Sequence, residues 1–170
     1  MSGAPFVVVI GPPGVGKSTV ARQLAARLNR RMVDTDALIE EREGRSISDI
    51  FVDSGEEYFR AAEARAVLDS LEEDGIVLAL GGGAPMIPAI TTALAEHRVL
   101  FLDVGIADAA RRIGFDKSRP LLSVNPRRSW IRTMEERRPT YESLASVHVD
   151  TAGRGVDEVV TEAMTKLEDA

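Results

Sequence analysis

The stretch Gly11-Pro12-Pro13-Gly14-Val15-Gly16-Lys17-Ser18 has the residue types and the spacing needed to hold phosphate groups. It fits the pattern G-x-x-x-x-G-K-[ST] of the phosphate-binding loop, or P-loop. Its glycines allow the chain to fold back on itself, so that successive backbone N–H groups converge on phosphate oxygens. The helix expected after the loop adds the partial positive charge of its N-terminus.

The flanking sequence supports this interpretation. An apolar strand pattern over 6–10 precedes the loop, and an amphipathic helix pattern over 19–29 follows it. A chance match in a glycine-rich turn is the alternative. We expect Lys17 to reach the outer phosphates of a nucleotide and the Ser18 hydroxyl to ligate Mg²⁺. The residues expected to bind the nucleotide are Gly14, Val15, Gly16, Lys17, Ser18 and Thr19.

Two carboxylates follow the next strand candidate, Met32-Val33. They are Asp34 and Asp36, and their spacing at a strand end allows them to take different roles. One could support Mg²⁺ and the other could face a substrate hydroxyl. The alternative, that Asp36 only caps the following helix, ranks second beside a P-loop.

Three glycines, 81–83, follow the apolar strand pattern over 76–80. Such a run indicates either unusual backbone angles or the close approach of another group. A plain flexible turn is the alternative, although one glycine normally suffices for that.

Several arginines are candidates for binding anions. Arg60 lies early in a long predicted helix, where a cation opposes the helix dipole, so an anionic ligand is expected near it. Arg138 precedes Pro139 at an expected helix end, and we assign it a functional role. Arg119 lies in the polar stretch 114–125, which is typical of a mobile lid. Most of the arginines after Pro126 are expected to be solvated surface charges.

Apolar strand patterns alternate with helical patterns along the chain. Ser54 and Glu57 form a capping-box signature that predicts a helix running to about Glu73. Further strands are expected over 99–102 and 147–149, and a last helix over 156–167. This alternation predicts an α/β fold, a single three-layer α/β/α domain over residues 1–170 with a central, mainly parallel five-stranded sheet. Ligands should gather at the carboxyl ends of its strands.

Composition narrows the possible functions. The chain has 170 residues, is 44% hydrophobic, carries a net charge of −6 and contains no cysteine. The negative charge argues against broad nucleic-acid or membrane-surface binding. The absence of cysteine excludes disulfides, thiolate metal sites and cysteine nucleophiles. No apolar run has the length of a membrane span. We expect a cytoplasmic protein, and a monomer, that acts on a small molecule.

Taken together, these features resemble the shikimate kinase family of P-loop kinases, over about residues 6–150. The ordered set of motifs is far more specific than the P-loop alone. Its landmarks are GPPGVGKST at 11–19, DTD at 34–36, GRSISDIF at 44–51, GEEYFR at 55–60, GGG at 81–83, RPLL at 119–122 and RRPTY at 137–141.

The resemblance implies ATP- and Mg²⁺-dependent phosphoryl transfer to the 3-hydroxyl of shikimate, giving shikimate 3-phosphate in aromatic amino acid biosynthesis. It implies that Asp36 holds the reacting hydroxyl and that Asp34 supports Mg²⁺, through water. Arg60 and Arg138 would bind the shikimate carboxylate. The substrate-binding helices would span about 35–62.

The same resemblance assigns the remaining contacts. Gly82 and Gly83 would offer backbone contacts to the hydroxyls of shikimate. Arg119 would close from a lid at about 114–125 onto the phosphates, where it would join Lys17 and Asp36 in catalysis. Arg112 would flank the adenine.

Other functions fit the residues less well. A GTPase-like switch needs a D-x-x-G motif soon after the P-loop, but the match here, at 150–153, lies near the C-terminus, and no N-K-x-D occurs. The physics of the residues alone leaves gluconate or a nucleotide open as the phosphoryl acceptor.

Overall fold

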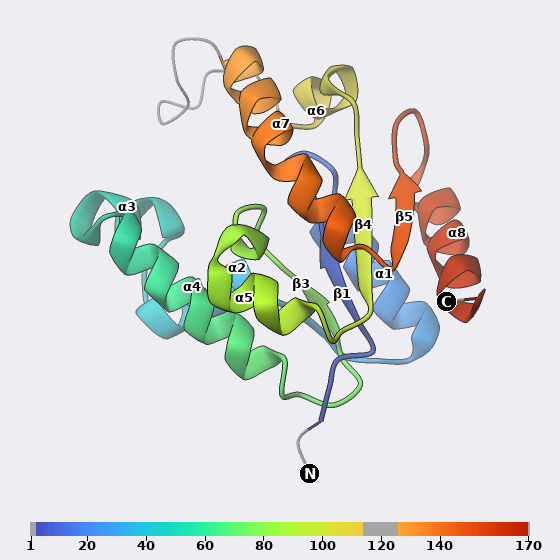
Figure 1. The fold of residues 1–170 in the computed structure, drawn as a ribbon, viewed down its shortest axis with the longest axis horizontal. Coiled ribbons are helices and arrows are strands. Elements are labelled where there is room, and N and C mark those ends of the chain that lie inside the picture. Colours follow the sequence, from blue (N-terminus) through green and yellow to red (C-terminus); the bar gives the residue numbers. More distant parts are fainter. Residues whose placement is uncertain (1–2, 114–125, 170) are drawn as a thin grey trace.

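The computed structural model describes residues 3–113 and 126–169. The expected lid at 114–125, with Arg119, lies outside this range. Strands and helices alternate along the chain, as expected (Figure 1). The elements are β1 (Val7–Ile10), α1 (Lys17–Leu28), β2 (Met32–Asp34), α2 (Thr35–Glu43), α3 (Ile47–Ser54), α4 (Glu56–Ser70), β3 (Val77–Ala79), the 3₁₀ helix η1 (Ala84–Met86), α5 (Pro88–Leu94), β4 (Val99–Asp103), α6 (Ile106–Ile113), α7 (Pro126–Leu144), β5 (Val147–Asp150) and α8 (Val156–Asp169).

The five strands form one sheet in the order β2-β3-β1-β4-β5. All four pairings are parallel, and Val8 of the central strand β1 pairs with Leu78 on one side and Val99 on the other. The carboxyl ends of all the strands therefore lie at one edge of the sheet (Figure 1).

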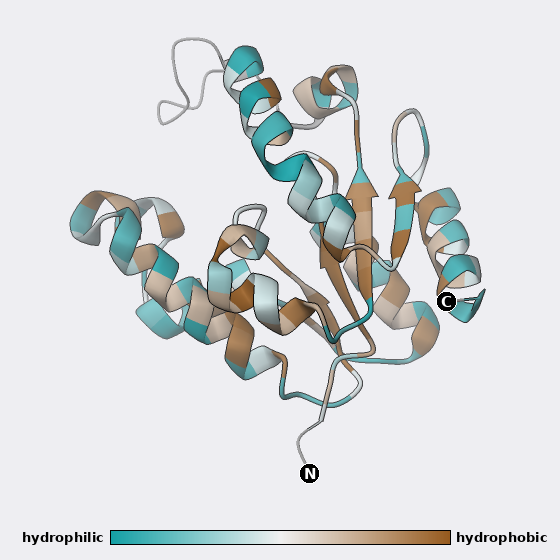
Figure 2. Ribbon diagram, in the orientation of Figure 1, coloured by the Kyte–Doolittle hydropathy of each residue, from teal (hydrophilic) through white to brown (hydrophobic). Residues whose placement is uncertain are grey.

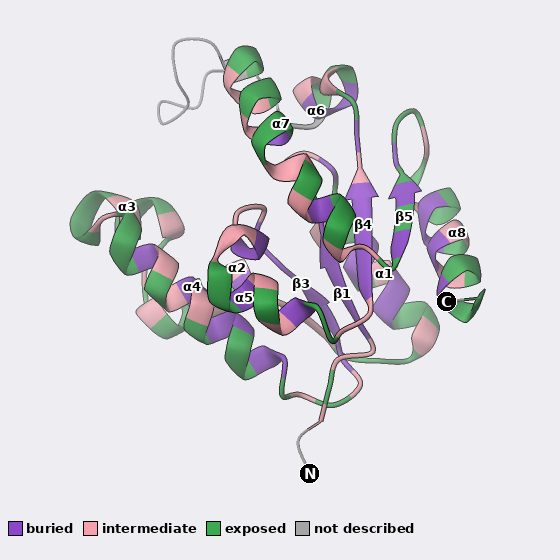
Figure 3. Ribbon diagram, viewed as in Figure 1, coloured by how far each residue is buried: buried purple, intermediate pink, exposed green. Residues whose placement is uncertain are grey.

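Helices cover both faces of this sheet, which explains its continuous apolar strands (Figures 2 and 3). Side chains alternate between the faces along β1. Val7 and Val9 join a buried cluster with α1 and α8, whereas Val8 and Ile10 join a second cluster with α4, α5 and α7. The predicted three-layer α/β/α fold is confirmed.

A third apolar cluster joins α2, α3 and α4 beyond the sheet. It contains Ile39, Ile50, Phe59 and Ala66. This cluster holds the three helices together and fixes the direction of α4, which carries Arg60. None of the helices in the described part of the chain is long and apolar enough to cross a membrane.

Three expected helix ends are wrong. Ser54 does not cap α4: it is the last residue of α3, its hydroxyl accepts a hydrogen bond from Arg45, and Gly55 takes the N-cap position at φ 89°. The same helix ends at Ser70 rather than near Glu73. Pro139 does not end α7 either, since this helix continues to Leu144.

Candidate active site

The P-loop connects β1 to α1 in the conformation that its glycines predict. Gly14 and Gly16 have φ angles of 83° and 84°, which L-residues with side chains rarely adopt. Gly16 is the N-cap of α1, and no side chain within the described residues caps this end. The backbone N–H groups of the first helical turn have no partner within the helix, so they are suited to binding an anion.

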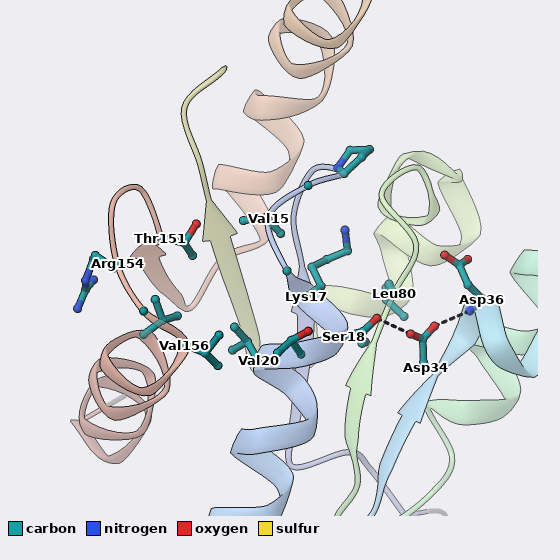
Figure 4. A pocket seen from close by; sticks show the side chains of 17 residues that line it. Val15, Lys17, Ser18, Val20, Asp34, Asp36, Leu80, Thr151, Arg154 and Val156 are labelled. Atoms are coloured by element: carbon teal, nitrogen blue, oxygen red, sulfur yellow. Dashed lines mark hydrogen bonds between the residues drawn. The ribbon is translucent and has the colours of Figure 1, made fainter. Parts of the chain in front are cut away.

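Asp34, at the end of β2, connects the P-loop to the start of α2. One of its carboxylate oxygens accepts the backbone N–H groups of Asp36 and Ala37 at 2.9 and 3.3 Å, so Asp34 caps α2. The other oxygen accepts a hydrogen bond of 2.5 Å from the Ser18 hydroxyl (Figure 4). The capping role considered for Asp36 therefore belongs to Asp34, and the Asp36 side chain is left to face the cavity.

Lys17 and Asp36 both have strongly shifted pKa values. Desolvation lowers the pKa of Lys17 to about 8, with a further contribution from the Arg137 cation, although Asp36 and Asp34 act in the opposite direction. Burial raises the pKa of Asp36 to about 6, and the negative charges of Asp34 and Glu63 add to this effect. Such shifts, found at a cluster of opposite charges in a cavity, are typical of a functional site.

The three glycines after β3 lie where other groups approach closely. None of them has a positive φ, so unusual backbone angles are not their reason. A Cβ atom on Gly81 would lie 2.7 Å from Asp36 Oδ1 and 2.9 Å from Glu63 Oε2. Side chains at this turn would therefore fill the space beside Asp36.

Two guanidinium groups meet above Gly83. A Cβ atom there would lie 2.9 Å from Arg60 Nη1 and 3.2 Å from Arg137 Nη2. Arg60 also donates a hydrogen bond of 2.6 Å to Glu63, whose carboxylate is buried. Burial raises the pKa of Glu63, while Arg60 and Arg137 oppose this shift.

The assignment of Arg138 is corrected by this arrangement. Arg138 does not meet Arg60; it pairs with Asp103 at the end of β4, with N–O distances of 2.7 and 2.9 Å. Because α7 continues through Pro139, successive residues project about 100° apart, and Arg137 is the residue that faces the glycines. The neighbouring side chain of Tyr141 donates a hydrogen bond of 2.6 Å to the Gly82 carbonyl.

A cavity of about 730 Å³ runs along the strand ends from the aspartates to the loop between β5 and α8 (Figure 4). Thr151, Arg154 and Val156 line its far end, on the other side of the P-loop from Asp36. The expected adenine contact, Arg112, lies in α6, but its side chain lies outside what the structure describes, as does Arg119.

The structure thus assembles most of the predicted residues at one edge of the sheet. It joins the P-loop residues 14–19, the two aspartates, the glycines 82 and 83, and Arg60. Sequence reasoning missed Glu63, Arg137 and Tyr141. A signal was available for Glu63, since an acidic residue three positions after Arg60 lies on the same face of a helix.

Known proteins resemble the chain over nearly its full length. A family model described as shikimate kinase matches residues 13–168. The shikimate kinase of Thermobifida fusca is 50% identical over 152 residues, covering 89% of this chain and 88% of that protein.

Solved structures agree with this match. The structure of shikimate kinase from Acinetobacter baumannii in complex with shikimate has a TM-score of 0.91 and 29% identity, covering 98% of this chain and 94% of that one. Shikimate kinase from Aquifex aeolicus has a TM-score of 0.83 and 33% identity, covering 95% of each chain. The P-loop, the aspartates and the paired arginines described above thus stand in a chain that belongs to the shikimate kinase family.

Proposed function

We propose that this protein transfers the terminal phosphoryl group of ATP to the 3-hydroxyl of shikimate, with Mg²⁺ as cofactor. The observation that carries this proposal is the meeting of Arg60 and Arg137 above Gly83, close to Asp36. Two guanidinium groups and one carboxylate match an acceptor that has one carboxylate and a reactive hydroxyl. The family membership of the chain supports shikimate as that acceptor.

The acceptor carboxylate would lie between Arg60 and Arg137. A planar guanidinium can give a carboxylate two parallel hydrogen bonds, which fixes its orientation as well as its position. Glu63 holds Arg60 from behind through the 2.6 Å hydrogen bond, so this guanidinium is pre-oriented. The backbone of Gly82 and Gly83 would contact the hydroxyls of the acceptor.

Asp36 would act on the reacting hydroxyl. Its carboxylate would accept the hydrogen bond of that hydroxyl, orient the oxygen toward the terminal phosphorus and take up the proton as the new P–O bond forms and ADP leaves. A pKa of about 6 suits this task, since the group is ionised at neutral pH yet more basic than an ordinary aspartate.

The nucleotide side fits the residues of the P-loop. Lys17 and the N–H groups at the start of α1 would hold the phosphates and neutralise charge that develops during transfer. Thr151, Arg154 and Val156 would surround the nucleoside, because they line the end of the cavity beyond the P-loop. The contacts of Arg112 with the adenine and of Arg119 with the phosphates are proposed from the family resemblance alone.

Ser18 and Asp34 fit a Mg²⁺ site. They lie in hydrogen-bond contact, and the described residues contain no cluster of three or more His, Asp or Glu side chains that could hold a metal. Mg²⁺ typically takes one or two protein ligands and completes its shell with waters and substrate phosphates. Ser18 and Asp34 would hold the ion, Asp34 through its water shell, and the ion would supply positive charge that neutralises the phosphates.

The test compares Arg137→Ala with Arg132→Ala, an exposed arginine on the same helix. Loss of hydrogen bonds to a charged group weakens binding by about 1.5–3 kcal/mol, so the KM for shikimate should rise about ten- to a hundredfold in Arg137→Ala. The KM for ATP should change little. If Arg137→Ala behaves like Arg132→Ala, the acceptor site has been misplaced.

The remaining expectations belong to the same proposal. The chain would act as a monomeric cytoplasmic enzyme on two small molecules, independently of nucleic acid or membrane. It would form one domain over 1–170, with substrate-binding helices at about 35–62 and a lid at about 114–125.

A further inference from the structure

Arg138 makes a two-pronged ion pair that the proposed reaction does not use. Its two terminal nitrogens donate to the two carboxylate oxygens of Asp103 at 2.7 and 2.9 Å. The Asp103 side chain is only 15% exposed, and Arg138 also lies 3.5 Å from Glu142, one turn further along α7. Paired hydrogen bonds of this kind fix direction as well as distance.

Asp103 holds several elements at the end of β4. Its side chain also accepts the N–H of Val104 at 2.8 Å and lies 3.2 Å from Nε2 of His148 on β5. Burial alone would raise its pKa, but the hydrogen bonds and charge of Arg138 bring the pKa of Asp103 below its usual value. Asp103 is therefore a charged anchor, fixed to two strands.

The helix that carries Arg138 crosses the site and is anchored along one face. Trp130 donates a hydrogen bond of 3.0 Å to the P-loop carbonyl of Pro13, and Tyr141 donates one of 2.6 Å to the Gly82 carbonyl. Both residues lie on the same side of α7 as Arg137. These contacts hold the face of α7 that carries Arg137, and the Arg138–Asp103 pair adds a restraint from the neighbouring face.

Pro139 weakens α7 at this place. It has no N–H to give to the carbonyl one turn back, at Glu135, so the helical turn that contains Arg137 lacks one of its backbone hydrogen bonds. The ion pair of Arg138 lies immediately before this proline and on the neighbouring face of the helix. It thus restrains the turn that lacks this backbone hydrogen bond.

We propose that the Arg138–Asp103 ion pair is a positioning device that holds the Arg137 guanidinium above Gly82 and Gly83. The pair, called the α7 clamp below, acts on the acceptor through Arg137 and does not touch it. This inference rests on the proposed function of Arg137. Arg138 would thus position another residue, and would not itself bind the shikimate carboxylate as the family resemblance implies.

Loss of the clamp should weaken binding of the acceptor but not of the nucleotide. Asp103 also supports the nucleotide end of the cavity, because its backbone carbonyl accepts hydrogen bonds from the N–H and hydroxyl of Thr151 at 2.9 and 2.8 Å. These bonds use the main chain, so they remain when the side-chain pair is broken. Removal of Arg138 should therefore raise the KM for shikimate and leave the KM for ATP unchanged.

The experiment is a double-mutant cycle with steady-state kinetics for both substrates. R138Q, R137A and R137A/R138Q are compared with the parent protein, and R132Q serves as an exposed control on the same helix. We expect R138Q to lower kcat/KM for shikimate about three- to thirtyfold, the range typical of coupling between neighbouring residues. In the R137A background, R138Q should change kcat/KM by less than about twofold, because the residue through which it acts is gone.

Several outcomes overturn the clamp. R138Q behaving like R132Q would do so, as would a loss of equal size in both backgrounds or an equal rise in the KM for ATP. If R138Q fails to fold, R138K answers the same question: a lysine keeps the charge and one contact, so its effect should be smaller than that of R138Q but still depend on Arg137. If R137A itself leaves the kinetics with shikimate unchanged, the proposed acceptor site is wrong and the clamp falls with it. If R137A is impaired and R138Q is not, only the clamp is wrong.

Discussion

Lys17 and Asp36 face the same cavity with pKa values of about 8 and about 6, each shifted toward neutrality. Water is partly excluded from both groups, and each charge is only partly balanced by the other. Such incompletely balanced, desolvated charges favour the binding of a highly charged ligand. The phosphates would bring the negative charge that Lys17 lacks, and the acceptor hydroxyl would bring a donor for Asp36.

The pH dependence of catalysis should reveal both groups. Since kcat/KM reports the free enzyme, its value for shikimate should fall below about pH 6 as Asp36 becomes protonated. For ATP, kcat/KM should fall above about pH 8 as Lys17 loses its proton. Steady-state kinetics between pH 5 and about 9.5 would measure both limits. An acid limit that persists in the residual activity of Asp36→Asn would show that another group is responsible.

Asp36 should also lower the stability of the fold at neutral pH. Its folded pKa of about 6 lies above the ordinary value of 3.8, so the folded protein holds the proton more tightly than the unfolded chain. The free energy of unfolding from this group therefore falls as pH rises between those values and stays low above them. Asp36→Asn removes this penalty but also removes an attractive partner of Lys17, so we expect a net gain of about 1 kcal/mol at pH 7.5.

Urea unfolding of the two proteins at pH 7.5 and at pH 4 would measure this effect. The stabilisation should be present at pH 7.5 and absent at pH 4, where Asp36 is protonated in the folded state. If the parent protein is as stable as Asp36→Asn at pH 7.5, the ionised Asp36 carboxylate does not destabilise the fold. A gain in stability together with a loss of turnover is what a functional carboxylate produces.

At the scale of the element, α7 connects the two halves of the site. Trp130 contacts the P-loop, Arg137 and Tyr141 contact the glycine turn after β3, and Met134 between them is buried in the core. These residues are spaced by three or four positions, so they lie on one face of the helix. The packing of one helix therefore sets the distance between the proposed nucleotide and acceptor positions.

Tyr141→Phe tests this connection. The Tyr141 hydroxyl donates a 2.6 Å hydrogen bond to the Gly82 carbonyl, and the residue is fully buried. Its removal leaves a partly buried carbonyl without this donor, which costs about 1–3 kcal/mol, or roughly 3–10 °C in Tm for a protein of this size. Tyr58→Phe is the control, because Tyr58 is 46% exposed and its hydroxyl meets Glu43. Equal melting temperatures of the two variants would show that the Gly82 contact contributes nothing.

The ends of elements were harder to predict than the elements themselves. The pair Ser54 and Glu57 looked like a capping box, but α3 runs through Ser54, and Gly55 makes the turn between the two helices. The sequence pattern could not show this because a capping serine and a last helical serine differ only in backbone angles. The packing of α3 against α4, rather than the local capping pattern, determines where these two helices end and begin.

The roles of Arg137 and Arg138 could not be told apart from the sequence for the same reason. Adjacent residues on a helix project about 100° apart, so an error of one position points to a different side of the helix. Pro139 favoured a helix end after Arg138, although prolines are also tolerated within helices at a cost. Only the positions of Tyr141 and Asp103 in space decide which arginine faces the glycines. The spacing of Glu63 to Arg60 indicates a shared helix face, but only the structure shows that the Glu63 carboxylate is buried against that guanidinium.

At the scale of the whole molecule, the site follows from the topology of a parallel sheet. The chain leaves β1 into the P-loop, β2 into the aspartates, β3 into the glycine turn, β4 at Asp103 and β5 toward Thr151. All five strands point the same way, so these segments meet at one edge. This level was predictable from the sequence, because it depends on the order of apolar strands and on the residues that follow each of them.

Ligand binding should therefore stabilise the whole domain, and the pattern of stabilisation identifies the ligands. A ligand at a hundred times its Kd adds about 2.7 kcal/mol to the free energy of unfolding, which raises Tm by roughly 5–10 °C for a protein of this size. We expect shikimate to give such a shift, and Mg²⁺ with a non-hydrolysable ATP analogue to give another. Gluconate and nucleoside monophosphates should give none at the same concentrations.

Thermal shifts of two site variants test which residues bind each ligand. Arg137→Ala should lose the shift with shikimate and keep the shift with the nucleotide, because its guanidinium lies beside Gly83 and away from the nucleoside end of the cavity. Lys17→Met should do the reverse, since its charge faces the phosphates. If gluconate stabilises the protein as much as shikimate does, the acceptor is a different hydroxy acid. If one variant loses both shifts, the two halves of the site are not separable in the way that the fold arranges them.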